Sequence, residues 1–204
     1  MTPSLASSWT SFCKIVWPDK CALCGAIGEQ FCDLCRAECR PAAVPGRPLE
    51  GLDEVRAAFL YQGRAKEAVA RLKFSRALAL ATPMAASVAA LLPDDANVVV
   101  PVPVHWTRRS RRGFNQATLL CEGSSLMRES CLVRVRRTGT QRGRDRAARL
   151  ASVRGAFVAS EVAGLRVVLV DDVCTSGGTL RACAEALREA GAASVRAVVF
   201  ARLD

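Results

Sequence analysis

The segment from Val167 to Leu180 constrains the fold of this chain more than any other part of it. It reads V-V-L-V-D-D-V-C-T-S-G-G-T-L: strand-favouring apolar residues, two adjacent carboxylates, a loop of hydroxyl groups and glycines, and the start of a helical pattern. This order predicts a buried strand over 166–170 that places Asp171 and Asp172 at the carboxyl edge of a sheet. Open α/β folds bind their ligands at that edge.

The loop after the two aspartates has the composition of an anion site. Glycines let backbone N–H groups approach an anion, hydroxyl groups donate further hydrogen bonds, and a helix that begins near Gly178 adds free amides. The alternative is a capped strand–turn–helix junction with incidental acids, although adjacent carboxylates are costly without a partner. The candidate phosphate-binding residues are Thr175, Ser176, Gly177, Gly178 and Thr179.

The rest of the chain alternates between strand and helix patterns. The apolar periodicity predicts strands over 55–61, 97–102, 132–135, 155–158, 166–170 and 194–201. It predicts helices over 65–74, 77–92, 115–128 and 178–189. Such alternation indicates an α/β fold with a mainly parallel, twisted sheet flanked by helices.

Four cysteines near the start of the chain have the spacing of a metal site. Cys21 and Cys24 form one C-x2-C pair, and Cys32 and Cys35 form a second pair after seven residues. Four thiolates around Zn2+ make a closed, structural site, and a segment this short needs one because it has no core of its own. The alternatives are reduced buried thiols or a redox pair. We therefore expect a zinc module over 17–41 and a second domain over 52–204.

The charge and the composition bound the partners and the compartment. The formal net charge is +10, and such a surface attracts phosphates on nucleotides, diphosphates or nucleic acid. An arginine-rich genome explains the charge equally well, because Arg is abundant and Lys is scarce. No apolar run is long enough for a membrane span, and the first ten residues do not resemble a secretory signal. We therefore expect a cytoplasmic protein.

The segment from Val167 to Leu180 resembles the phosphoribosyl-diphosphate signature of the type I phosphoribosyltransferases. Together with the cysteine module, it makes the whole chain similar to the ComF family of competence-associated, phosphoribosyltransferase-like proteins. The resemblance also includes Tyr61, Leu72-Lys73-Phe74, Val100-Pro101-Val102-Pro103, Arg112-Gly113-Phe114-Asn115-Gln116, Thr138, Gln141, Gly155-Ala156-Phe157 and Ala201-Arg202.

This resemblance implies a role for each part of the site. Asp171 and Asp172 would contact the ribose hydroxyls, and the loop of 175–179 would wrap the 5′-phosphate. The diphosphate-loop and lid candidates are Val102, Pro103, Arg108, Arg109, Arg112 and Gln141. The residues themselves leave alternatives open: a rigid proline turn at 101–103, a helix start capped by Asn115, and a basic 138–149 loop that is solvated or contacts nucleic acid.

The family resemblance leads to two hypotheses about function. In the first, the protein binds phosphoribosyl diphosphate with Mg2+ and transfers the phosphoribosyl group to an acceptor that the sequence does not identify. Positioning and charge neutralisation would carry such a reaction. In the second, it binds single-stranded DNA during natural competence, alongside other proteins of the uptake machinery, and the fold serves as a ligand-binding module. DNA binding would be sensitive to salt and would survive loss of both aspartates.

Overall fold

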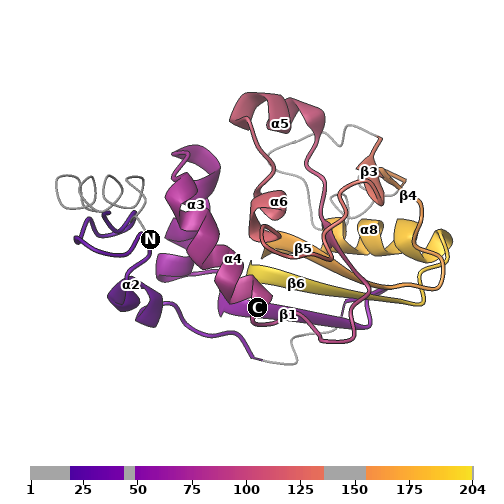
Figure 1. Ribbon diagram of the computed structural model, residues 1–204, viewed down its shortest axis with the longest axis horizontal. Helices are drawn as coiled ribbons and strands as arrows, with labels where there is room; N and C mark the ends of the chain where they lie inside the picture. Colours follow the sequence, from indigo (N-terminus) through magenta and orange to yellow (C-terminus); the bar gives the residue numbers. More distant parts are fainter. Residues whose placement is uncertain (1–18, 44–48, 136–154, 204) are drawn as a thin grey trace, which may run out of the picture.

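Four parallel strands form the central sheet of the computed structural model, which describes residues 19–43, 49–135 and 155–203 (Figure 1). The strand order is β1-β6-β5-β2, and all three pairings are parallel, as the sequence predicts. The strands are β1 (Glu54–Leu60), β2 (Val98–Pro101), β5 (Arg166–Cys174) and β6 (Ser194–Arg202).

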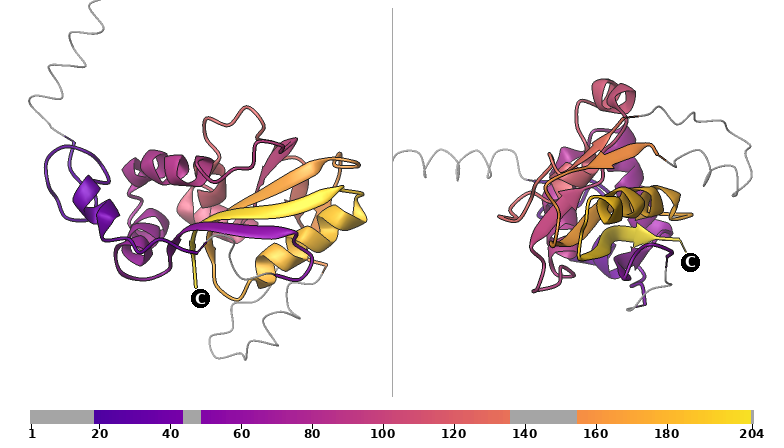
Figure 2. Two further views of the ribbon diagram at one scale, coloured as in Figure 1. Left: turned by 90° about the horizontal axis from the view of Figure 1, so that it is seen from below. Right: turned by 90° about the vertical axis from the view of Figure 1, so that its right-hand side faces the viewer.

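Helices cover both faces of this sheet, and strand alternation divides the core in two. Val167 and Leu169 pack in a cluster with residues of α8 (Gly178–Glu189), which runs along one face (Figure 2). Val168 and Val170 pack in a second cluster on the opposite face. That face is covered by α3 (Gly63–Phe74), the 3-10 turn Leu78–Leu80, α4 (Ala81–Ala89) and α6 (Gln116–Leu120). The predicted α/β architecture is therefore confirmed.

Two short strands pair with each other outside the main sheet. β3 (Leu132–Arg134) and β4 (Phe157–Ala159) form an antiparallel ribbon, on which Phe157 packs into the same core cluster as α8. The sequence predicts both strands but not their separate pairing. Among the described helices, none is long and apolar enough to cross a lipid bilayer.

The strand that carries the two aspartates is longer than expected. Predicted to end at Val170, it runs to Cys174, because β6 continues beside it and pairs Asp171 with Val199 and Val173 with Ala201. The two aspartates therefore lie within the strand itself and not in the loop that follows it. Successive residues of an extended strand point to opposite faces, so Asp171 and Asp172 are directed to different sides of the sheet.

The helix predicted over 115–128 is wrong in its extent. Only Gln116–Leu120 is helical, and the chain turns through Gly123, whose φ is +89°. The following residues extend along the free edge of β2, where the Val99 N–H donates to the Leu126 carbonyl at 2.9 Å. Hydrogen bonding to the exposed edge of β2 is thus favoured over continuing the helix, because a short helix is only marginally stable.

The helix α5 (Trp106–Arg112) has no counterpart in the sequence prediction. It carries four arginines and has no buried residue, so it shows no apolar periodicity to detect. Its ends are nevertheless defined: the His105 side chain accepts from the Thr107 N–H, and Gly113 ends the helix with φ +88°.

Candidate functional site

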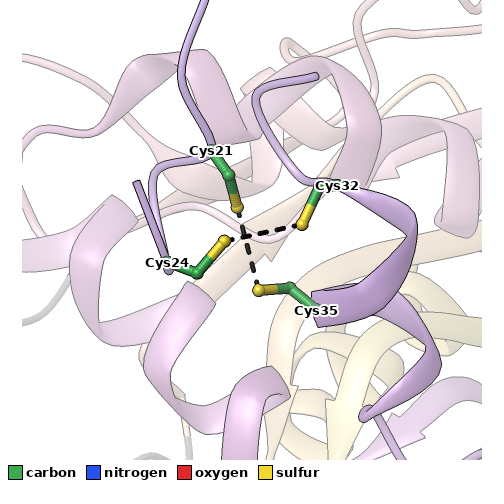
Figure 3. A group of neighbouring side chains, drawn as sticks. All are labelled: Cys21, Cys24, Cys32 and Cys35. Carbon is green, nitrogen blue, oxygen red and sulfur yellow. Dashed lines mark hydrogen bonds between the residues drawn. The ribbon is translucent and has the colours of Figure 1, made fainter. Parts of the chain in front are cut away.

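The four sulfur atoms of the predicted zinc ligands converge on one point (Figure 3). All lie within 4.8 Å of one another; Cys21 Sγ is 3.8 Å from Cys35 Sγ, and Cys24 Sγ is 3.6 Å from Cys32 Sγ. Tetrahedral Zn2+ with bonds of about 2.3 Å separates neighbouring sulfurs by about 3.8 Å. The predicted cysteine cluster is therefore confirmed, and its geometry is compatible with zinc.

Local structure positions the two cysteine pairs. The first lies on a turn in which the Gly25 N–H donates to the Cys21 carbonyl at 2.9 Å, with Gly25 at φ +79°. In the second, Cys32 is the N-cap of α2 (Asp33–Ala37) and Cys35 lies inside that helix. Each arrangement turns two thiols toward the same side of a short segment.

The thiols of the cluster are not equivalent in their pKa values. Burial opposes ionisation of Cys21, but backbone N–H groups of Cys24 and Cys32 outweigh it and lower the pKa of the Cys21 thiol to about 6. Burial and the neighbouring thiols raise the pKa of Cys35. Cys39 lies outside the cluster: its thiol donates to the Cys35 carbonyl at 3.4 Å, and burial raises its pKa to about 11.

The cysteine module is attached to α3 by arginines of that helix. The Arg71 guanidinium donates to the carbonyl of Ala22 and, at 3.4 Å, to that of Leu23. Arg64 pairs with Glu38 at 2.8 Å. Phe31 of the module is buried in the same core cluster as Leu72 of α3, so the contact has an apolar part as well.

The second of the two aspartates forms a nearly buried ion pair. Asp172 Oδ2 lies 2.6 Å from Lys73 Nζ, and the Asp172 side chain is only 7% exposed. Lys73 belongs to the last turn of α3. Lys73 belongs to the Leu72-Lys73-Phe74 motif of the family resemblance, but no sequence pattern joins it to Asp172, because only the packing of α3 on β5 brings the two together.

The first aspartate has a different environment. Its Oδ1 accepts a hydrogen bond from the Asp172 N–H at 2.8 Å. Burial raises the pKa of Asp171 well above its ordinary value, the adjacent Asp172 carboxylate adds to this effect, and Lys73 opposes it. The two carboxyl groups are therefore electrostatically distinct although they are neighbours in the sequence.

The predicted phosphate loop leads directly from β5 into α8. Gly177 is the N-cap of that helix with φ +75°, and the helix begins at Gly178 as the sequence predicts. Thr175 is exposed, and Ser176 and Thr179 are half-buried, so all three hydroxyl groups lie near solvent. The free amides at the start of a twelve-residue helix lie beside these hydroxyl groups.

The turn after β2 lies at the same carboxyl edge of the sheet. Val102 is buried, its N–H donates to the Val170 carbonyl at 2.9 Å, and Pro103 follows it. The Asn115 side chain donates to the Val102 carbonyl at 3.2 Å and accepts from the Ala117 N–H, so the predicted cap is confirmed. The turn is therefore held from two sides.

The predicted arginines lie on α5, beyond this turn. Arg108 and Arg109 are exposed, whereas Arg112 is half-buried with its guanidinium 5.3 Å from the centre of the Phe74 ring. Burial and neighbouring arginines lower the pKa of Arg112, and Asp172 opposes them. Gln141 and the predicted basic lid over 138–149 lie outside the described residues.

The parallel sheet carries paired carboxylates, a glycine- and hydroxyl-rich loop and a helix start at one edge, which is the edge where open α/β proteins bind their ligands. Residues 75–203 match the phosphoribosyl transferase domain family, and the chain belongs to that family. The resemblance drawn from the sequence motifs is thus confirmed.

Several curated relatives carry names that refer to DNA utilization or to competence. The DNA utilization protein YhgH of Salmonella typhi is 39% identical over 52% of this chain and 48% of its own length. Competence protein F of Haemophilus influenzae is 35% identical over 51% of this chain and 49% of its own length. Competence protein ComFC of Bacillus subtilis is 28% identical over 89% of this chain and 77% of its own length. The chain spans about half the length of the first two relatives.

Among solved structures, the glutamine phosphoribosylpyrophosphate amidotransferase of B. subtilis is similar to part of this chain. The matched region covers 65% of this chain and 30% of the amidotransferase chain. The TM-score is 0.45 and the sequence identity is 27%.

The Gly177→Ala substitution tests how tightly the phosphate loop is packed. A Cβ at this position would lie 2.6 Å from Leu49 Cδ1, whereas the same atom at Gly164, with φ +72°, would meet nothing within 4 Å. Both alanine variants bear a backbone cost of about 1–2 kcal/mol for left-handed φ. We expect Gly177→Ala to lower the free energy of unfolding by about 1 kcal/mol more than Gly164→Ala in urea denaturation. Equal losses would show that Leu49 does not confine the loop.

Proposed function

We propose that this protein binds phosphoribosyl diphosphate at the carboxyl edge of its sheet and transfers the phosphoribosyl group to an acceptor. The observation that carries this proposal is the direct succession of the Asp171–Asp172 pair, the hydroxyl-rich loop and the start of α8. Membership of the phosphoribosyl transferase domain family supports it.

Each part of the edge has a role in this proposal. Thr175 to Thr179 hold the 5′-phosphate through hydroxyl groups and helix amides, and the aspartates accept hydrogen bonds from the ribose hydroxyls. The turn at Val102 and Pro103, with the arginines of α5, receives the diphosphate. Neutralising the leaving group is the main catalytic requirement, because the diphosphate departs with its charge.

Mg2+ fits the donor set of this edge, since carboxylate oxygens are its preferred protein ligands. Asp172 is the residue that would hold it directly, and Asp171, which is directed to the other side of the strand, would act through the ribose hydroxyls. When bound, the ion would stabilise negative charge on the diphosphate as a Lewis acid. The chain's own contribution is to orient the sugar and to hold the 5′-phosphate in the loop of 175–179.

Isothermal titration calorimetry with phosphoribosyl diphosphate, with and without Mg2+, tests the proposal. We expect binding by the native protein and at least a tenfold loss of affinity in the Asp171→Asn, Asp172→Asn double variant, because two charged hydrogen-bond acceptors are removed. Asp94→Asn, which changes an exposed carboxylate away from the edge, should bind as the native protein does. Absence of binding under both conditions would refute the proposal.

We also propose that the cysteine cluster holds one structural Zn2+. The zinc content of the purified protein, measured by plasma mass spectrometry, should be one ion per chain. Cys24→Ala should lose the metal because it removes one of the four clustered thiols. Cys39→Ala is the matched control: its thiol is buried outside the cluster and donates to the Cys35 backbone carbonyl, so the zinc should remain. A metal-free native protein would contradict the assignment.

A second candidate function is binding of single-stranded DNA, favoured by one particular surface. Trp106 and Phe74 are 68% and 75% exposed, Arg112 of α5 lies over the Phe74 ring, and Arg108, Arg109 and Arg111 of the same helix are exposed. Exposed aromatic rings among arginines can stack on bases while the cations contact phosphates. The name DNA utilization protein, carried by one of the relatives, agrees with a role that involves DNA.

Fluorescence anisotropy with a labelled oligothymidine tests this candidate. We expect affinity that falls steeply with salt, persists in the double aspartate variant, and drops about tenfold in Trp106→Ala, since a stacked base contributes about 1–3 kcal/mol. Val158→Ala removes an exposed apolar side chain on the β3–β4 ribbon and should leave binding unchanged. Equal binding by Trp106→Ala and the native protein would exclude this surface.

A further inference from the structure

The ion pair between Lys73 and Asp172 lies at the position where a ligand is expected to bind. Lys73 Nζ and Asp172 Oδ2 are 2.6 Å apart, and the Lys73 side chain as a whole is 21% exposed, so the pair lies close to the surface of the sheet edge. A buried carboxylate that faces a ligand site and has a close cationic partner is already neutralised. A ligand that needs this carboxylate must therefore compete with Lys73.

The same end of α3 also contacts the basic helix. Phe74 lies beneath the Arg112 guanidinium at 5.3 Å, and Arg76 Nη2 donates to the Arg111 carbonyl at 3.5 Å. The last turn of α3 therefore connects strand β5, which carries the carboxylates, with α5, which follows the turn at Val102 and Pro103. An ammonium group released from Asp172 would remain near the place proposed for the diphosphate.

We propose that Lys73 is a resident counter-ion that exchanges partners when the ligand binds. A divalent cation takes its place at Asp172, and the released ammonium group binds an anionic phosphate oxygen of the ligand. This inference rests on the proposed function of the same site. The physical reason for the exchange is electrostatic repulsion: a divalent cation and the Lys73 ammonium group, both held against one carboxylate in a region of low dielectric, repel each other. The flexible four-carbon side chain of lysine allows the exchange without movement of α3.

The exchange predicts two opposite effects of a single substitution. In Lys73→Met, Mn2+ (a paramagnetic probe for Mg2+) should bind at least tenfold more tightly, because its competitor is gone. The affinity for phosphoribosyl diphosphate should fall at least tenfold, because a phosphate contact is lost. Electron paramagnetic resonance measures the first and calorimetry the second. If Lys73 had only a structural role, Lys73→Met would bind both Mn2+ and phosphoribosyl diphosphate more weakly.

Two controls isolate the charge at this position. Lys66→Met removes an exposed lysine on the same helix and should change neither affinity. Lys73→Arg keeps a cation beside Asp172 and should keep Mn2+ binding as weak as in the native protein. In an Asp172→Asn background, Lys73→Met should no longer improve Mn2+ binding, because the double-mutant cycle removes the shared carboxylate.

Unchanged or weaker Mn2+ binding by Lys73→Met, in a protein that unfolds cooperatively on heating, would overturn the inference. If Lys73→Met does not fold, Lys73→Gln, which keeps a polar but uncharged side chain at this position, is expected to show the same gain in Mn2+ affinity and is judged by the same criterion. The Mn2+ measurement contains no phosphoribosyl diphosphate. Failure of the native protein to bind that compound would therefore refute the proposed function and leave the competition at Asp172 separately measurable.

Discussion

The site depends on the parallel pairing of β5 with β6 beyond the last apolar residue of β5. This pairing, with Asp171 opposite Val199 and Val173 opposite Ala201, holds the aspartates in extended backbone at the edge of the sheet. It directs the two carboxyl groups to opposite faces, so one meets Lys73 and the other remains among buried groups with a raised pKa. A strand that ended at Val170 would leave both acids in a loop with the same surroundings.

Helix α3 connects the cysteine cluster with this edge. Arg71 bonds backbone carbonyls of the cysteine module, and Lys73, two residues later, pairs with Asp172. The last turn of one helix therefore contacts both the module and the carboxylate. Zinc in the module would therefore stabilise the segment that positions Lys73, in addition to replacing the core that the module lacks.

The fold and most of the site were predictable because their signals are local. The C-x2-C pairs, the apolar run before Asp171 and the glycines before α8 each specify a conformation within a few residues. The errors have physical causes as well. α5 buries no residue and so carries no periodic pattern, and the 115–128 segment leaves the helix to pair with the edge of β2. Neither outcome follows from the apolar periodicity of the residues concerned.

The sequence by itself determined which groups are present at the site: a carboxylate pair, a hydroxyl-rich loop at a helix start, and four thiols at metal spacing. Only the tertiary structure decided how they are neutralised. Asp172 meets Lys73, and Arg112 lies over Phe74, because packing of α3 and α5 at the sheet edge brings distant segments together. Charges that are far apart in the chain interact only when folding removes the water between them, and no local pattern records that contact.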